Sequence, residues 1–105
     1  MVFISGPITG EDNYLWNFAE AEYELYKQGF TVINPARVLS QLPDESRRHW
    51  DDLMEVCKIL LAQCDSIYML RGWEKSRGAN MEYRLAEERG MKVMYQDGTG
   101  DEKET

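Results

Sequence analysis

The polar and apolar positions of this chain follow two different periods. Four short runs are apolar and rich in β-branched or aromatic residues, as buried strands are: "VFIS", "FTVINP", "DSIYML" and "KVMYQ". Between them, apolar residues recur every three or four positions. This period predicts helices from Tyr14 to Gln28, from about Arg48 to Gln63, and over "NMEYRLAEER". Gly29 and Gly90 follow the first and third of these helices, where glycine commonly ends a helix.

The alternation of strands and helices predicts an α/β fold. We expect a single-domain, three-layer, flavodoxin/Rossmann-like sandwich of four or five parallel strands with helices on both faces. The domain should cover residues 1–96, and residues 97–105, "DGTGDEKET", should form a flexible acidic tail. "ARVLSQLPDES" is predicted to be turn-rich, with one helical turn. Ligands of such sheets bind beyond the carboxyl ends of the strands, so the site is expected in the loops Ser5–Asn13, Asn34–Pro35 and Arg71–Ala79.

Composition limits the function. The 105-residue chain has a net charge of −7, which argues against binding nucleic acid through its phosphates. No apolar run is long enough to span a membrane, and the start has no basic leader, so we expect a cytoplasmic protein. Cys57 and Cys64 are too far apart on one predicted helix for a disulfide, and His49 is the single histidine. We therefore expect no metal and no cofactor, and interpret both cysteines as small buried apolar residues.

Two loops carry candidate binding residues. "SGPITG" offers two glycines whose amides could approach a ligand closely, but it fits neither the P-loop nor the dinucleotide-binding motif, and a plain tight turn is equally consistent with it. "SRGA", at Ser76–Ala79, precedes a helix and could bind an anion at the helix N-terminus beside Arg77. Its alternative, which is the more common case, is an N-capping serine followed by a packing glycine.

Glu82 is the candidate catalytic residue. We expect it in or just beyond the first turn of the third predicted helix, close to the ends of the first and third strands. A carboxylate there could be a nucleophile or a general base, or it could simply complement the helix dipole. Asp65 lies at the opposite end of the third strand, so we interpret it as structural. Tyr14, Trp16 and Trp73 could stack on a ligand, although core packing is the commoner role of such aromatics.

Four stretches, "FISGPITG", "GFTVINPA", "CDSIYML" and "SRGANMEYRLA", resemble the nucleoside 2-deoxyribosyltransferase-like superfamily. The resemblance runs in the same order over nearly the whole chain, to about Tyr95. It is strongest to short phage and prophage members without an assigned function. The superfamily also includes N-glycosidases that act on nucleoside 5′-monophosphates.

The resemblance implies roles for individual residues. Glu82 matches the family's nucleophile, which attacks the anomeric carbon of the sugar and forms a glycosyl-enzyme intermediate. The loop at Gly6 would lie along the nucleoside. Ser76 matches a serine that binds the 5′-phosphate in the monophosphate-hydrolysing branch, where the transferase branch has an aspartate. Ser5 and Arg77 would assist in binding that phosphate.

Two departures from the family pattern keep other functions open. Family members commonly have a tyrosine near the end of the first strand that positions the nucleophile, whereas here the aromatic residue is Phe3, which has no hydroxyl. The leaving base also needs a proton donor, for which Asp12, Asn34 and Tyr14 are candidates. We expect a nucleoside 5′-monophosphate N-glycosidase or a deoxyribosyltransferase-like enzyme. The alternatives are a non-catalytic protein of phage origin that binds a nucleotide or a nucleotide signal, and a structural protein with a relict site.

The expected partner is a small nucleotide or nucleoside, not a nucleic acid or a membrane. The expected substrate-binding residues are Ser5, Gly6, Pro7, Ile8, Asn34, Ser76, Arg77, Gly78 and Ala79. We also expect a homo-oligomer, a dimer or larger. In the family a neighbouring subunit often completes the site, and aromatic residues are enriched at interfaces.

Overall fold

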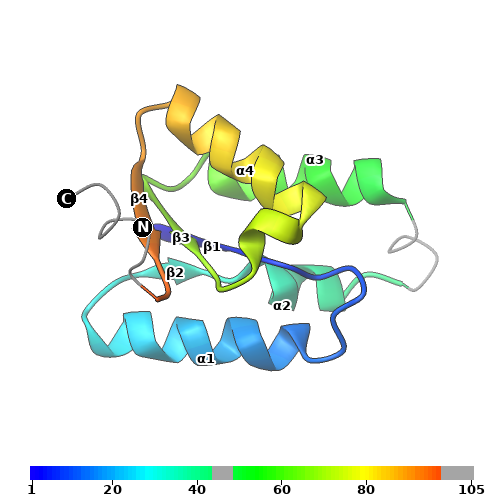
Figure 1. Ribbon diagram of the computed structural model, residues 1–105, viewed down its shortest axis with the longest axis horizontal. Coiled ribbons are helices and arrows are strands. Elements are labelled where there is room, and N and C mark those ends of the chain that lie inside the picture. Colours follow the sequence, from blue (N-terminus) through cyan, green and yellow to red (C-terminus); the bar gives the residue numbers. More distant parts are fainter. Residues whose placement is uncertain (44–48, 98–105) are drawn as a thin grey trace.

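The computed structural model describes residues 1–43 and 49–97 and confirms the predicted α/β fold. A four-stranded parallel sheet in the order β2-β1-β3-β4 lies between two layers of helices (Figure 1). The strands are β1 (Val2–Ser5), β2 (Val32–Ile33), β3 (Ser66–Met69) and β4 (Lys92–Tyr95). After β1 the chain forms β2 on one edge of β1, and then forms β3 on its other edge, followed by β4. The direction in which strands are added therefore reverses between β1 and β3. Sheets of this kind bind ligands at that reversal.

The helices cover both faces of the sheet. They are α1 (Tyr14–Lys27), α2 (Pro35–Ser40), α3 (Trp50–Leu61) and α4 (Arg77–Glu88), with the short 3-10 helix η2 (Trp73–Lys75) before α4. On one face α3 and α4 pack on Phe3, while on the other α1 packs on Val2 and Ile4. Neighbouring residues of β1 therefore enter different cores, which explains why this strand is buried throughout rather than alternating between buried and exposed positions.

Several element boundaries differ from the sequence prediction. The second strand contracts to two residues, because Asn34 ends it and caps α2, which is longer than the single predicted turn. The last helix begins at Arg77 rather than near Asn80, since the Ser76 side chain accepts a hydrogen bond from the N–H of Ala79. Glu82 consequently lies in the second turn of α4.

Other expectations about the termini of elements are confirmed. Gly29 and Gly90 have φ angles of 92° and 68°, as left-handed residues that end helices do. Asp65 lies at the amino end of β3, away from the expected site, where its carboxylate accepts a hydrogen bond from the amino group of Met1 (2.9 Å). The predicted tail, apart from Asp97, lies outside the described residues, as does Arg48. In the described chain the second long helix begins at Trp50, with His49 at its N-cap.

Candidate active site

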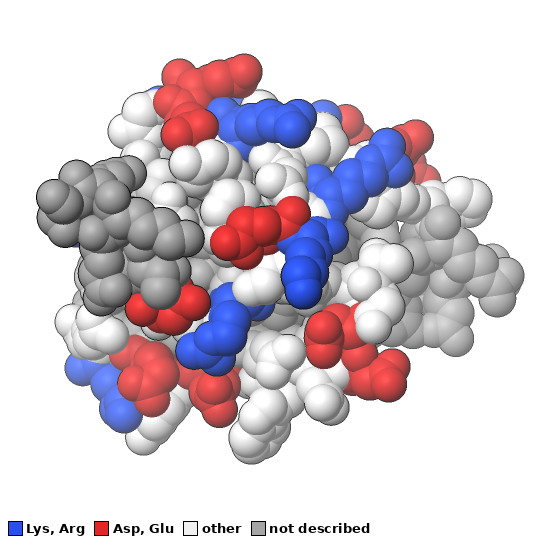
Figure 2. Space-filling view, in the orientation of Figure 1, with Lys and Arg blue, Asp and Glu red and all other residues white. Residues whose placement is uncertain are grey.

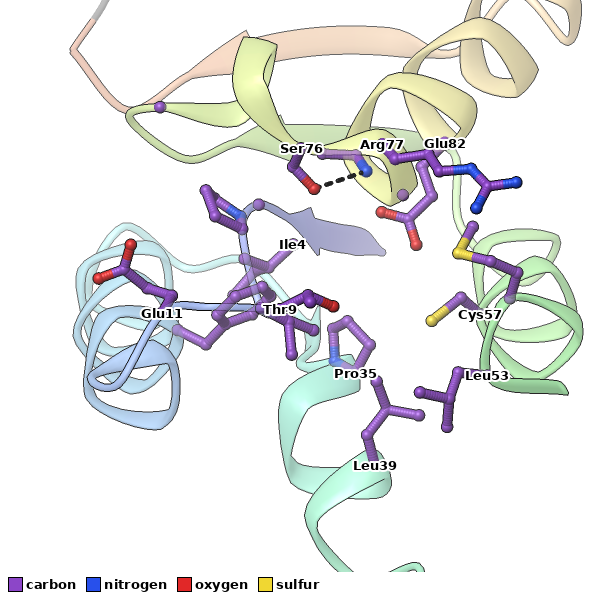
Figure 3. A pocket seen from close by; sticks show the side chains of 18 of the residues that line it. Ile4, Thr9, Glu11, Pro35, Leu39, Leu53, Cys57, Ser76, Arg77 and Glu82 are labelled. Atoms are coloured by element: carbon purple, nitrogen blue, oxygen red, sulfur yellow. Dashed lines mark hydrogen bonds between the residues drawn. The ribbon is translucent and has the colours of Figure 1, made fainter. Parts of the chain in front are cut away.

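A cavity of about 670 Å³ opens at the carboxyl ends of the strands, beside the point where the strand order reverses (Figure 3). It is enclosed by the loop after β1, by α2, by the first turns of α3 and by the segment from β3 into α4. The expected loops after the first and third strands therefore meet there. Of the predicted binding residues, seven line the cavity: Gly6, Pro7, Ile8, Ser76, Arg77, Gly78 and Ala79. Glu82 joins them from the second turn of α4.

Glu82 is a buried carboxylate with few partners. Its side chain is 5% exposed, and the hydroxyl of Ser5 donates a hydrogen bond to its Oε1 atom (2.5 Å). Burial raises the pKa of Glu82 from 4.5 to about 7, because a charged carboxylate is disfavoured away from water, and the hydroxyl of Ser5 and the nearby thiol of Cys57 partly offset that rise. Glu82 is thus poised to change its protonation state near neutral pH.

Two predicted binding residues have other roles. The hydroxyl of Ser5 is turned to Glu82, and Ser5 does not line the cavity, so its expected part in binding a phosphate stays a prediction. Asn34 does not line it either. Its side-chain oxygen accepts from the N–H of Ala36 (3.0 Å) and its amide donates to Glu22 (3.0 Å), so it serves α2 and the contact with α1. Of the proton-donor candidates, Asp12, Asn34 and Tyr14 all lie outside the cavity lining.

The N-terminus of α4 forms one wall of the cavity. The first N–H groups of a helix have no partner within it, and Ser76 satisfies that of Ala79. The predicted N-cap role of Ser76 is therefore confirmed. Because the hydroxyl accepts in that bond, its own proton remains available to a ligand. The N–H groups of Arg77 and Gly78 belong to the same wall, so this end of α4 has the donors that an anion requires.

Three basic residues surround this wall: Arg71, Lys75 and Arg77 all line the cavity. Among the described residues, none of them forms an ion pair. The guanidinium of Arg77 stacks over the ring of Trp50, 3.7 Å from its centre, which joins the starts of α4 and α3. On the face drawn in Figure 2, basic and acidic side chains are interspersed, and no broad surface of positive charge is seen.

Glycines in the cavity wall allow close packing. A Cβ atom on Gly6 would lie 2.7 Å from the Cβ of Leu70, so the loop after β1 can follow the end of β3 only without a side chain there. A Cβ atom on Gly78 would lie 3.2 Å from the Sδ atom of Met54. Gly78 therefore lets α3 approach α4 closely, which is the packing role that the sequence left open for it.

Sequence reasoning missed several lining residues. Cys57 is buried, as expected, but it also borders the cavity next to Glu82. Trp50 and Phe18 are the aromatic residues of the lining, whereas Trp73 packs instead on Tyr83, with ring centres 4.8 Å apart. Tyr14 and Trp16 do not line the cavity. Glu11 is the one other acidic residue in the lining, and Figure 3 shows it across the cavity from Glu82.

Within residues 1–43 and 49–97, no three His, Cys, Asp or Glu side chains are grouped so that they could hold a metal ion. No helix in this part of the chain has the length and apolar character needed to cross a membrane.

Comparison with known proteins gave one match. A family model described as "Domain of unknown function (DUF4406)" matches residues 1–95. This range contains every residue of the cavity wall. No match was found among curated proteins, and none among solved structures.

Proposed function

We propose that this chain, which belongs to the DUF4406 family, is a nucleoside 5′-monophosphate N-glycosidase or a deoxyribosyltransferase-like enzyme. The observation that carries the proposal is the position of Glu82. Its carboxylate is buried, held by Ser5 and turned into a cavity whose adjoining wall is the basic N-terminus of α4. A nucleophile and an anion-binding wall side by side suit a sugar that carries a phosphate.

The cavity is divided in a way that suits a nucleotide. The phosphate would meet the hydroxyl of Ser76, the first N–H groups of α4 and the guanidinium of Arg77. An apolar wall extends away from this end and would take the base: Ile4, Ile8, Phe18, Pro35, Leu39 and Leu53. Ligand pockets commonly combine such an apolar lining with a few polar groups that fix orientation. The volume of about 670 Å³ lies within the usual range for small-molecule sites.

In the proposed reaction, an Oε atom of Glu82 attacks the anomeric carbon of the sugar. The bond from that carbon to the base nitrogen breaks, and its electron pair leaves with the base, which takes up a proton from solvent. Water, or a second base in a transfer reaction, then attacks the same carbon and releases a proton to solvent, and Glu82 leaves as a carboxylate. Two displacements at one carbon retain its configuration.

The protonation of Glu82 sets the pH dependence of this reaction. Only the ionised carboxylate is a nucleophile, and with a pKa of about 7 it is about half ionised at pH 7. The rate of base release should therefore rise as the pH increases through 7 and level off above 8. A general acid at the same position would give the opposite dependence.

A second function is a protein that binds a nucleotide or a nucleotide signal without cleaving it. It is favoured by the absence of Asp12, Asn34 and Tyr14 from the cavity lining, since these were the candidate proton donors for the leaving base. Glu11 is acidic and lines the cavity, but it lies across from Glu82. The phage origin, the cytoplasmic location and the homo-oligomer stay predictions. Trp16, Tyr23 and Tyr26 are exposed on α1 and could contribute to an interface between copies.

The deciding experiment follows free base by chromatography during incubation with ribo- and deoxyribonucleoside 5′-monophosphates. Wild type is compared with Glu82→Gln and with a matched control, Glu88→Gln, which changes an exposed acid on the same helix. Base released by wild type and the control but not by Glu82→Gln supports the enzyme. No release from any nucleotide contradicts it. In that case a nucleotide-dependent rise in Tm supports the binding protein.

A further inference from the structure

We propose that Trp50 is a positioning residue for the phosphate end of the cavity: its ring holds the guanidinium of Arg77 in place to bind the phosphate of a nucleotide. The phosphate belongs to the proposed function, on which this inference rests, whereas the stacked pair itself does not. Trp50 would act through Arg77 and would not stack on the base.

Two contacts place Trp50 against the first turn of α4. Trp50 is the first residue of α3, and the Cζ atom of Arg77 lies over its ring, 3.7 Å from the ring centre. The indole nitrogen lies beside Gly78, 4.0 Å from the place that a Cβ atom of that residue would take. All three residues line the cavity. The ring of Trp50 therefore lies between the start of α3 and the wall that would bind the phosphate.

The ring restricts a side chain that would otherwise move freely. Arg77 is exposed, and it is the first residue of α4. An exposed arginine samples many side-chain conformations, and ordering it when a ligand binds lowers the affinity. A guanidinium that already lies on an aromatic ring has less of this freedom to lose. Trp50 should therefore strengthen the binding of a phosphate without touching it.

The stacked arrangement leaves the guanidinium able to bind an anion. An aromatic ring contacts the flat face of the guanidinium, whereas its N–H groups point outward in the plane. Among the described residues, Arg77 forms no ion pair that would occupy those groups. Arg77 can consequently keep its contact with Trp50 and donate hydrogen bonds to a phosphate at the same time.

Trp50 has two alternative roles in which it would contact the ligand directly. Its ring could stack on the base, although Arg77 already covers one face of that ring. Its indole N–H could donate to the phosphate, since it lies beside Gly78 in the same wall. The three roles require different parts of the side chain: a ring face for Arg77, a ring face for the base, or the N–H group. Substitutions can therefore distinguish them.

The test measures binding of the four deoxyribonucleoside 5′-monophosphates and of their parent nucleosides by calorimetry. Every protein, including the reference, carries Glu82→Gln, so that the proposed nucleophile cannot cleave the ligand during the titration. We expect Trp50→Leu to weaken binding of the monophosphates about 2–5-fold, as a cation–π contact at an exposed site would, and to leave the nucleosides unchanged. Trp50→Phe keeps a ring but lacks the N–H, and it should bind the monophosphates like the reference. The control is Trp16→Leu, an exposed tryptophan outside the cavity lining, which should change neither ligand.

A double-mutant cycle tests whether Trp50 acts through Arg77. In a protein that already carries Arg77→Ala, Trp50→Leu should weaken the monophosphates no further. An additional loss in that protein overturns the inference. An equal loss for monophosphates and nucleosides in Trp50→Leu also overturns it, because the ring would then stack on the base. So does a Trp50→Phe protein that behaves like Trp50→Leu, because the N–H would then be the group that matters.

The stacked pair can also be observed without a ligand. In NMR spectra, the ring current of Trp50 should shift the side-chain signals of Arg77, which are assigned with Arg77→Ala. Trp50→Leu should abolish that shift. Arg77 signals that are the same with and without the ring overturn the inference, whatever the protein binds.

The outcomes separate this inference from the proposed function. A loss of affinity in Trp50→Leu that is confined to the monophosphates, with no base release by wild type, supports the role of Trp50 and contradicts the glycosidase. Base release by wild type, with no effect of Trp50→Leu on either ligand, supports the glycosidase and overturns the role of Trp50. If none of the monophosphates binds, the role of Trp50 is overturned as well.

Discussion

The buried carboxylate of Glu82 should lower the stability of the folded protein at neutral and alkaline pH. Glu82→Gln keeps the shape of the side chain and removes its ionisation. The amide oxygen of the new residue can still accept the hydrogen bond that Ser5 donates to Oε1. The main change is therefore the loss of one buried titrating group.

The magnitude follows from the two pKa values of Glu82. Below pH 4.5 the carboxyl group is protonated in both the unfolded and the folded chain, and it costs nothing. Between 4.5 and about 7 the folded chain retains a proton that the unfolded chain has released, so the free energy of unfolding falls as the pH rises. Above pH 7 the carboxyl group is ionised in both states, and the free energy of unfolding falls no further. The difference of about 2.5 between these pKa values, at 1.36 kcal/mol for each pH unit, corresponds to about 3 kcal/mol.

Urea unfolding of wild type and Glu82→Gln at pH values from 5 to 8.5 measures this cost. The free energy of unfolding of Glu82→Gln minus that of wild type should increase by about 2–3 kcal/mol across the range, since a small part of the cost is already present at pH 5. For a domain of this size, the difference in Tm should grow by about 10–20 °C. Glu88→Gln, on the exposed side of the same helix, should show no such trend.

A constant difference between the two proteins across the pH range would refute the reasoning. It would mean that Glu82 has the same pKa in the folded and in the unfolded chain. Water would then hydrate the carboxylate that the structure buries. A difference of the opposite sign would mean that the ionised carboxylate is stabilised by a charge that the described residues do not provide.

Three further predictions concern the neighbours of this carboxylate. Ser5→Ala removes the hydroxyl that donates to Glu82, so the pH midpoint of base release should rise by about 1 unit, and an unchanged midpoint would contradict the hydrogen bond. Gly78→Ala should lower the free energy of unfolding by about 1–2 kcal/mol in urea, despite the better helix propensity of alanine, because its Cβ would lie 3.2 Å from a buried sulfur atom. A neutral or stabilising effect would show that the helices can separate freely. Arg77→Ala should weaken binding of a nucleoside 5′-monophosphate about 10-fold in calorimetry and leave the parent nucleoside little affected, with Arg84→Ala as the control on the same helix. Equal losses for both ligands would remove Arg77 from phosphate binding.

The sequence was sufficient to predict the architecture and the edge of the sheet that carries the cavity. Both follow from periodicity and from the rule that parallel strands direct their carboxyl ends to one edge. Glu82 could be singled out, but its burial could not. The prediction began the last helix at Asn80 and so left "SRGA" in the loop, whereas the Ser76 cap starts the helix at Arg77.

Two other differences have physical reasons. Asn34 was expected in the cavity, although "NPA" is itself a helix-start pattern: an N-capping residue followed by proline in the first turn. That pattern could have been recognised. The place of Cys57 in the cavity lining could not, because a cysteine on an apolar stripe is usually core. That place depends on how closely α3 and α4 approach each other, and the close fit of Gly78 to Met54 contributes to this approach.

The hydrogen bond between Ser5 and Glu82 joins residues 77 positions apart, from the first strand to the last helix. As the chain leaves the ribosome, β1 emerges long before the carboxylate that its hydroxyl will hold. The pKa of Glu82 is raised only when the whole domain has folded and buried the carboxylate. A compact but loosely packed intermediate could contain every helix and still have an ordinary glutamate at position 82. The titration of this single side chain is therefore a measure of complete folding that helix content cannot provide.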